Sequence, residues 1–248
     1  MSKIYLIVLM FLFVSCTGKA PITGREQMVL ISPAQEKSLG ESSYREFLKS
    51  AKISTDKIQT ARIKAIGEKI ATAADRDDFE WEFNLVEDKQ INAFCLPGGK
   101  VVVYTGILGI AKNDDQLATV MSHEIAHALA RHGAERMTHQ QISSGIQTLG
   151  NILIGAAAPE YRDVFNVAYG YGTQLGVMLP YSRSHEYEAD AIGVYLMKKA
   201  GYDINEAIRF WENMKKEKGG SQIEFLSTHP SDENRIKRIT QIVKEMKE

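Results

Sequence analysis

The chain has 248 residues, of which 44% are hydrophobic and 25% charged, and its 30 basic and 31 acidic residues leave a formal net charge of −1. These values are typical of a globular protein with a sizeable core, and they exclude a wholly disordered or collagen-like chain. The balanced charge also argues against a dedicated nucleic-acid binder, which carries a basic excess or stripe. Two cysteines are too few for a disulfide scaffold.

The N-terminus has the pattern of a secretory signal. Lys3 precedes an apolar run over residues 4–14, and small residues follow it. This run is shorter than the stretch of about 20 residues that a membrane-spanning helix needs. Cys16 stands where a bacterial lipoprotein carries its acylated cysteine. We therefore expect a signal peptide over residues 1–15 and a lipidated tether over residues 16–33, held at a membrane by the acyl chains.

Hydrophobic periodicity indicates one mostly helical domain over residues 34–248, with a small sheet near its start. Apolar residues at helical spacing predict helices over residues 34–49, 58–74, 116–137, 182–200, 205–216 and 231–247. Alternating or β-branched apolar residues predict short strands over residues 80–86, 91–95 and 101–104. Because these strands are close in sequence, we expect a small antiparallel sheet and an α+β fold.

Local signals indicate where several helices begin and end. Asp114 and Asp115 suit a helix N-terminus, Gly201 suits a C-cap, and Ser231 suits an N-cap. Residues 141–180 are rich in Gly, Ala and Ser. We expect one or two helices there, joined flexibly and lying over the active cleft.

The predicted helix over residues 116–137 carries an H-E-x-x-H motif, formed by His123, Glu124 and His127. Four residues turn a helix by about 400°, so the two histidines project from one face, where they can hold one Zn²⁺. Glu124 can then reach a water molecule on the metal and act as the general base. The surrounding apolar residues indicate a buried helix, whose polar side chains need partners such as a metal.

A hydrolytic zinc site needs three protein ligands and one open position. His132 and His139 follow on the same predicted helix, but they do not match the longer H-E-x-x-H-x-x-G-x-x-H pattern, and we expect both to be exposed. The better candidate is Glu186, in the predicted helix over residues 182–200. His185 competes with it on spacing alone.

Two more carboxylates follow in that helix. Asp190 lies one turn after Glu186 and would accept the free N–H of a metal-bound imidazole. Glu188 projects in another direction, and we expect it on the surface. The alternative for the whole stretch is a solvated, charged helix face.

Seven short motifs occur in order along the chain: Pro21-Ile22-Thr23-Gly24-Arg25, Asn92-Ala93-Phe94, Leu96-Pro97-Gly98-Gly99, His123-Glu124-x-x-His127, Ser182-Arg183, Glu186-x-x-Ala189-Asp190 and Thr228-His229-Pro230. Together they resemble the HtpX-like and CaaX-prenyl-protease family of zinc metallopeptidases, and most closely its bacterial lipoprotein branch. The resemblance implies a zincin-type fold and a gluzincin site with one Zn²⁺ per chain. In that site His123, His127 and Glu186 bind the metal, Glu124 is the base and Asp190 is the supporting carboxylate.

The roles of two further residues stay open at this point. The resemblance places His229 near the metal, where it would stabilise the oxyanion or cover the open coordination position. The alternative is a loop histidine packed on Pro230. Arg183 would orient Glu186 or bind a substrate carbonyl, and its alternative is a surface ion pair. The strand over residues 101–104 would form the sheet edge above the site, where a peptide adds as an extra strand.

The sequence thus predicts a zinc-dependent metalloendopeptidase of the bacterial cell envelope, facing the periplasm and lipid-anchored, with the outer membrane as the expected one. The resemblance implies quality control, in which misfolded or misassembled envelope proteins are degraded, and contact with the outer-membrane assembly machinery. The rival hypothesis is a lipoprotein with a latent site that acts mainly as a chaperone or assembly factor for outer-membrane proteins. Hydrolysis of a cell-wall amide is a weaker third possibility.

Overall fold

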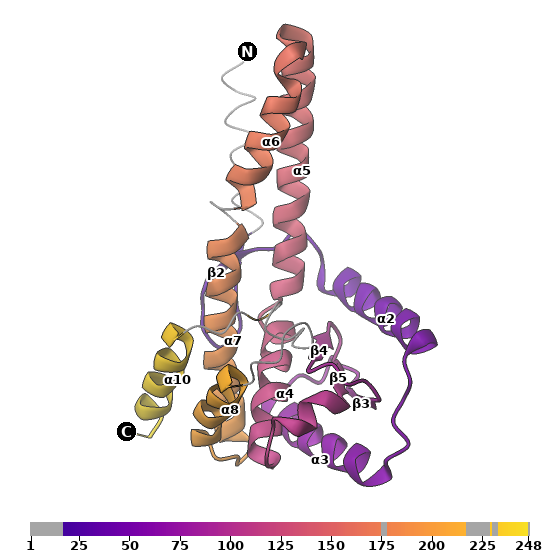
Figure 1. Cartoon of the computed structure of the whole chain (residues 1–248), viewed down its shortest axis with the longest axis vertical. Helices are drawn as coiled ribbons and strands as arrows, with labels where there is room; N and C mark the ends of the chain where they lie inside the picture. Colours follow the sequence, from indigo (N-terminus) through magenta and orange to yellow (C-terminus); the bar gives the residue numbers. More distant parts are fainter. Residues whose placement is uncertain (1–16, 175–177, 217–228, 230–232, 248) are drawn as a thin grey trace.

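The structure is a computed structural model, and it describes residues 17–174, 178–216, 229 and 233–247. It confirms a mostly helical α+β fold, in which helices and a three-stranded sheet surround one central helix (Figure 1). Five predicted helices recur as α2 (Pro33–Ser50), α3 (Lys57–Ala74), α7 (Leu179–Lys199), α8 (Asn205–Lys216) and α10 (Glu233–Glu245). Gly201 follows α7 with a φ of 81°, as its C-cap signal predicts, whereas Ser231 lies outside the described residues.

The central helix is α4 (Asp114–Leu129), which lies between α3, α7 and the sheet. Asn113 caps its N-terminus, because the Asn113 side chain accepts a hydrogen bond from the Gln116 backbone N–H at 2.8 Å. Residues on every side of α4 are buried. The helix is therefore fixed from all sides, which makes it a rigid support for a site.

The small sheet has the strand order β3-β5-β4, with β3 (Glu82–Val86), β4 (Ala93–Leu96) and β5 (Lys100–Tyr104). The prediction of an antiparallel sheet holds only for the β4–β5 hairpin, because β3 runs parallel to β5. The hairpin turns through Gly98 and Gly99 at φ values of 88° and 91°, which glycine adopts readily. The expectation that β5 is the edge strand is wrong: β5 is central, and β4 is the edge strand beside α4.

The single helix predicted over residues 116–137 is two helices in the structure. α4 ends at Leu129, and Arg131 then adopts a left-handed conformation with φ 58° and ψ 32°. α5 (His132–Ala157) begins directly afterwards. The hydrophobic pattern continues across this break, so periodicity alone could not locate it.

α5 and α6 (Arg162–Thr173) form an antiparallel hairpin, joined through the short turn η2 (Pro159–Tyr161). The hairpin projects away from the rest of the molecule (Figure 1). Its described part therefore does not cover the domain, contrary to the expectation of a lid over residues 141–180. No helix in the described ranges is both long and apolar enough to cross a bilayer.

The segment that we expected to be a tether is packed on the domain. β1 (Thr17–Lys19) pairs antiparallel with β2 (Glu26–Met28). The backbone N–H of Met28 donates to the Glu135 carboxylate of α5 at 3.3 Å. The predicted signal peptide and its lipid site lie outside the described residues.

Candidate metal centre

Two packed helices supply three candidate metal ligands. His123 and His127 lie one turn apart on α4, and their Nε2 atoms are 3.1 Å apart. Glu186 of α7 places Oε2 3.3 Å from His123 Nε2 and Oε1 3.3 Å from His127 Nε2. α7 packs along α4, so the close contact of these helices brings the three side chains together.

His229 completes the cluster. Its Nδ1 lies 3.3 Å from His123 Nε2 and 3.0 Å from Glu186 Oε2. Four potential ligand atoms thus lie within 4.8 Å of one another, one each from His123, His127, Glu186 and His229. The second ring nitrogen of His229, Nε2, is 3.5 Å from Glu124 Oε1.

The distances in this cluster fit a tetrahedral zinc site. Zinc bonds of about 2.0–2.2 Å to nitrogen and oxygen separate tetrahedral ligands by about 3.3–3.6 Å. The closest ligand pairs here are 3.0–3.3 Å apart. Two imidazole nitrogens at 3.1 Å form a hydrogen bond only if one carries a proton, whereas a shared cation satisfies both. Three nitrogens and a carboxylate oxygen are donors that suit Zn²⁺.

Glu124 is a buried carboxylate beside this cluster. Apart from the approach of His229 Nε2, its Oε1 atom has no hydrogen-bond partner among the described residues. Burial raises the pKa of Glu124 to about 7. A buried carboxylate oxygen without a partner is costly. Water beside a metal would satisfy it, so this feature also fits a hydrolytic zinc site.

The first imidazole is oriented by a carboxylate and an arginine. His123 Nδ1 lies 3.0 Å from Asp190 Oδ1, and Arg235 of α10 forms two contacts with Asp190, at 2.6 and 2.8 Å. Burial would raise the pKa of Asp190, but the charge and hydrogen bonds of Arg235 keep this pKa below its usual value. Arg235 also reaches Glu186 Oε2 at 3.1 Å and stacks 3.7 Å from the Trp211 ring centroid.

The second imidazole contacts another histidine. His127 Nδ1 lies 2.8 Å from His132 Nδ1, and His132 Nε2 lies 3.0 Å from Glu188 Oε2. Arg25 then bridges two acids, with Nε 2.6 Å from Glu188 and Nη2 2.7 Å from Glu135. Burial lowers the pKa of His132 to about 4. It would raise the pKa of Glu188, but hydrogen bonds from its neighbours lower that pKa to about 2.

Two expectations about exposure are wrong. His132 and Glu188 are only 1% and 7% exposed. The break at Arg131 starts a new helix at His132, which turns this side chain toward α7. His185, the competitor for the third ligand, stacks on His132 at 3.9 Å and contacts Glu135 at 3.1 Å, so it belongs to this second network.

An arginine other than Arg183 contacts the cluster. Arg183 is exposed on α7, and the guanidinium beside Glu186 belongs to Arg235. Sequence reasoning missed Arg235, because nothing in the local pattern of α10 links it to residues more than 40 positions away. Arg25 could have been singled out, since it ends the Pro21-Ile22-Thr23-Gly24-Arg25 motif.

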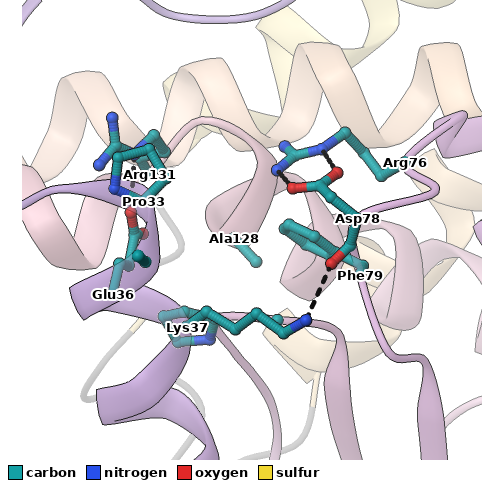
Figure 2. A pocket seen from close by; sticks show the side chains of 11 residues that line it. Pro33, Glu36, Lys37, Arg76, Asp78, Phe79, Ala128 and Arg131 are labelled. Carbon is teal, nitrogen blue, oxygen red and sulfur yellow. Dashed lines mark hydrogen bonds and ion pairs between the residues drawn. The ribbon is translucent and has the colours of Figure 1, made fainter.

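The surroundings of the cluster include an edge strand and a pocket. β4 packs beside α4, and burial together with the charge of Glu124 raises the pKa of the Cys95 thiol in this strand. A pocket of about 280 Å³ opens near the end of α4, between Glu36, Phe79 and Arg131 (Figure 2). None of its lining residues is a candidate metal ligand, although Ala128 directly follows His127.

Comparisons with known proteins agree with this geometry. The sequence model of peptidase family M48 matches residues 57–243. The chain is 34% identical over 224 residues to the mitochondrial metalloendopeptidase OMA1 of Schizosaccharomyces pombe, covering 88% of this chain and 64% of that protein. It is 31% identical over 229 residues to the beta-barrel assembly-enhancing protease of Escherichia coli K12, covering 90% and 47%. The chain thus spans about half to two thirds of the length of these relatives.

Proposed function

The chain belongs to peptidase family M48, and from that premise we propose that it is a zinc-dependent metalloendopeptidase. The observation that carries the proposal is the convergence of His123, His127 and Glu186 beside the unsatisfied oxygen of buried Glu124. These three side chains would hold Zn²⁺, whose chemistry is to polarise a peptide carbonyl and to make water more acidic.

Glu124 acts as the general base in this mechanism. It takes a proton from the attacking water and delivers it to the amine of the leaving peptide. Its raised pKa, about 7, makes it a stronger base than an exposed glutamate. Asp190 and Arg235 hold His123 and Glu186 in place, and a donated N–H of His229 would stabilise the tetrahedral oxyanion.

The substrate would bind as an extended segment. β4 is an edge strand beside α4, and only β5 pairs with it among the described strands. A peptide that adds to its other edge would be held by backbone hydrogen bonds, which impose little sequence preference. This mode of binding suits unfolded proteins, and it replaces the prediction that residues 101–104 form the edge.

A second candidate function follows from His229. A hydrolytic zinc site keeps one position open, but here His229 Nδ1 lies with the other three ligand atoms. This arrangement favours a latent form, in which the chain acts mainly as a chaperone or assembly factor. Peptidase activity then requires that His229 leaves the fourth position when substrate binds.

We place this protein in the bacterial cell envelope, facing the periplasm, as a peptidase for misfolded or misassembled envelope proteins. The apolar run over residues 4–14 and Cys16 support lipid anchoring to a membrane, and we propose the outer one. The relatives are named for mitochondrial proteolysis and for β-barrel assembly, and the second name supports contact with the outer-membrane assembly machinery.

Detergent phase partitioning tests the anchor. Wild type should enter the detergent phase, and Cys16→Ser should remain in the aqueous phase because it cannot be acylated. An unchanged distribution of the Cys16→Ser variant would exclude lipidation at this residue.

The decisive experiment measures zinc content and cleavage of unfolded casein in the same preparation. Wild type should hold one zinc per chain and cleave casein. Glu124→Gln should keep its zinc and lose nearly all cleavage, because the amide that replaces the carboxylate cannot accept the proton. Full cleavage by this variant would contradict the mechanism. If an envelope defect is complemented equally well by Glu124→Gln, the chaperone function is the correct one.

A further inference from the structure

Different side chains orient the two candidate zinc histidines, His123 and His127. The side chains that contact His127 lead to Arg25 in the N-terminal segment. We propose that Arg25, Glu188 and His132 form a positioning chain that sets the tautomer and orientation of His127. This inference rests on the proposed zinc site. It assigns a role to buried His132 and Glu188 and to half-buried Arg25, which the proposed reaction does not otherwise use.

The donor and the acceptor of each hydrogen bond between His127, His132 and Glu188 can be assigned once the proton of His127 is placed. His127 presents Nε2 to the cluster, so its proton must be on Nδ1 when Nε2 binds a metal. That N–H points at His132 Nδ1, 2.8 Å away, which must therefore accept. A neutral His132 then carries its proton on Nε2 and donates it to Glu188 at 3.0 Å. One carboxylate thus fixes two imidazoles in succession.

Arg25 fixes the carboxylate in turn. Its Nε donates to Glu188 at 2.6 Å, while its Nη1 and Nη2 donate to Glu135 at 3.1 and 2.7 Å. Thr23 also donates to Glu188. The planar guanidinium matches two acids at once, which a lysine ammonium would not do. The β1–β2 segment is thereby joined to the metal centre through two side chains.

The arrangement parallels the one on the other imidazole. His123 is oriented by Asp190 and Arg235, and His127 is oriented by His132, Glu188 and Arg25. Both acids come from α7, and both arginines come from segments near the ends of the chain. Groups that orient metal-bound histidines typically change metal affinity by about 10–100-fold when they are removed.

Matched substitutions at His132 in the full-length protein test the positioning chain. His132→Leu removes the acceptor, so we expect zinc affinity, measured by chelator competition, to fall by about 10–100-fold. His132→Asn keeps one acceptor and one donor, and it should restore most of that loss. The absorption spectrum of the Co²⁺-loaded protein should shift in the Leu variant and return toward wild type in the Asn variant. Arg25→Gln should weaken zinc binding as well, whereas Arg45→Gln, in an exposed ion pair with Glu41, should not.

The outcomes separate this proposal from the proposed function. If wild type binds no zinc, the proposed function fails. If wild type binds zinc and cleaves casein, but folded His132→Leu binds zinc equally tightly with an unchanged Co²⁺ spectrum, only the positioning chain is refuted. Equal losses in the Leu and Asn variants would also overturn it, because packing and not hydrogen bonding would then explain them.

The α5–α6 hairpin carries a second, independent inference, because polar groups lie between its helices while large apolar side chains lie on its outside. Its two helices meet where Phe165 packs on Gly150 and through polar groups: the amides of Gln147 and Asn151 both donate to Asn166 Oδ1 at 2.9 Å, and the Tyr169 hydroxyl donates to the Ser143 carbonyl at 2.9 Å. Seven large apolar side chains on its outer surface are each more than half exposed: Ile146, Leu149, Ile152, Leu153, Val164, Val167 and Tyr171. A helical hairpin in water has the opposite arrangement.

Two features indicate what covers this surface. The residues 140–174 include only three charged side chains, Glu160, Arg162 and Asp163, all close to the turn. The expected lipid site, Cys16, directly precedes β1, whose partner β2 packs against the start of α5. Helices with polar contacts inside and apolar residues outside suit hydrocarbon. We infer that the outer surface of the hairpin dips into a lipid bilayer, the one that would also hold acyl chains on Cys16.

Tryptophan quenching tests this contact with the full chain on vesicles of phosphatidylethanolamine and phosphatidylglycerol. Leu149→Trp should be quenched more strongly by brominated lipids than Thr148→Trp, which replaces an exposed polar neighbour. Equal quenching in both variants, with the protein bound to the vesicles, would overturn the inference. A dimer in sedimentation that is lost in Leu149→Ser would also overturn it, by assigning the surface to a second copy.

Discussion

Glu186 is the residue on which the candidate zinc site depends most. It lies between both imidazoles, and three histidines and one arginine contact its carboxylate. Burial would raise the pKa of Glu186, but hydrogen bonds from His123, His127 and His229 hold this pKa far below its usual value. The carboxylate is therefore charged at neutral pH, as a metal ligand must be.

Replacement of this carboxylate by an amide should show whether Glu186 is a metal ligand or an ordinary buried acid. Glu186→Gln keeps the shape but removes the charge, so zinc affinity should fall by at least the roughly 10–100-fold that is typical of supporting groups. Zinc content after dialysis measures the loss. Glu212→Gln, an exposed residue on α8, is the control and should retain zinc. Equal zinc in wild type and Glu186→Gln would reassign the ligand.

The sequence predicts residues of the candidate site where a residue type that binds metal also recurs at helical spacing. The pair His123 and His127 follows from helical geometry, because four residues make about one turn. His132 could not be placed in the same way, because its orientation depends on the left-handed conformation of Arg131. Arg235 could not be predicted as a partner of Glu186, because only tertiary packing brings the two side chains into contact.

At the scale of elements, the site depends on how closely α4 and α7 approach. Gly193 of α7 faces the α4 backbone, where an added Cβ atom would lie 3.2 Å from the His123 nitrogen and 3.3 Å from its Cα. That separation is tight for any side chain. The glycine therefore permits the helix contact that brings Glu186 to the two imidazoles.

A larger side chain at this position should push the helices apart. Gly193→Val should lower the free energy of unfolding by about 1–3 kcal/mol, which is typical of overpacking. It should also weaken zinc binding, because Glu186 moves with α7. Chemical denaturation and chelator competition measure the two effects. Gly133→Val is the matched control, since no atom lies within 4 Å of an added Cβ there. A similar result for both variants would refute close packing as the cause.

The elements themselves were largely predictable, whereas their arrangement was not. Apolar periodicity located α2, α3 and α8 to within a residue or two of their ends. The order β3-β5-β4 was missed, because short strands that follow one another suggest a meander, and only the tertiary fold places β5 in the centre. The position of β5 also decides which strand can bind a peptide.

At the scale of the whole molecule, the site and the hairpin form separate parts. The candidate ligands described here come from α4, from α7 and from His229. The outer part of α5 packs on α6 and η2, and the hairpin extends away from the sheet and the central helix (Figure 1). Composition predicted helices in this region, but a sequence rich in Gly, Ala and Ser carries no signal for the direction in which they project.

Shortening the hairpin should therefore leave catalysis intact. Replacement of residues 146–170 by a short Gly-Ser turn removes all but Tyr171 of the seven exposed apolar side chains, and it keeps the first turns of α5, where Glu135 and Thr138 contact the N-terminal segment. We expect the zinc content and the rate of casein cleavage in detergent to stay within about twofold of wild type, because no ligand or positioning residue is removed. Solubility without detergent should rise, because less apolar surface is exposed. A loss of cleavage with zinc still bound would show that the hairpin contributes to substrate binding after all.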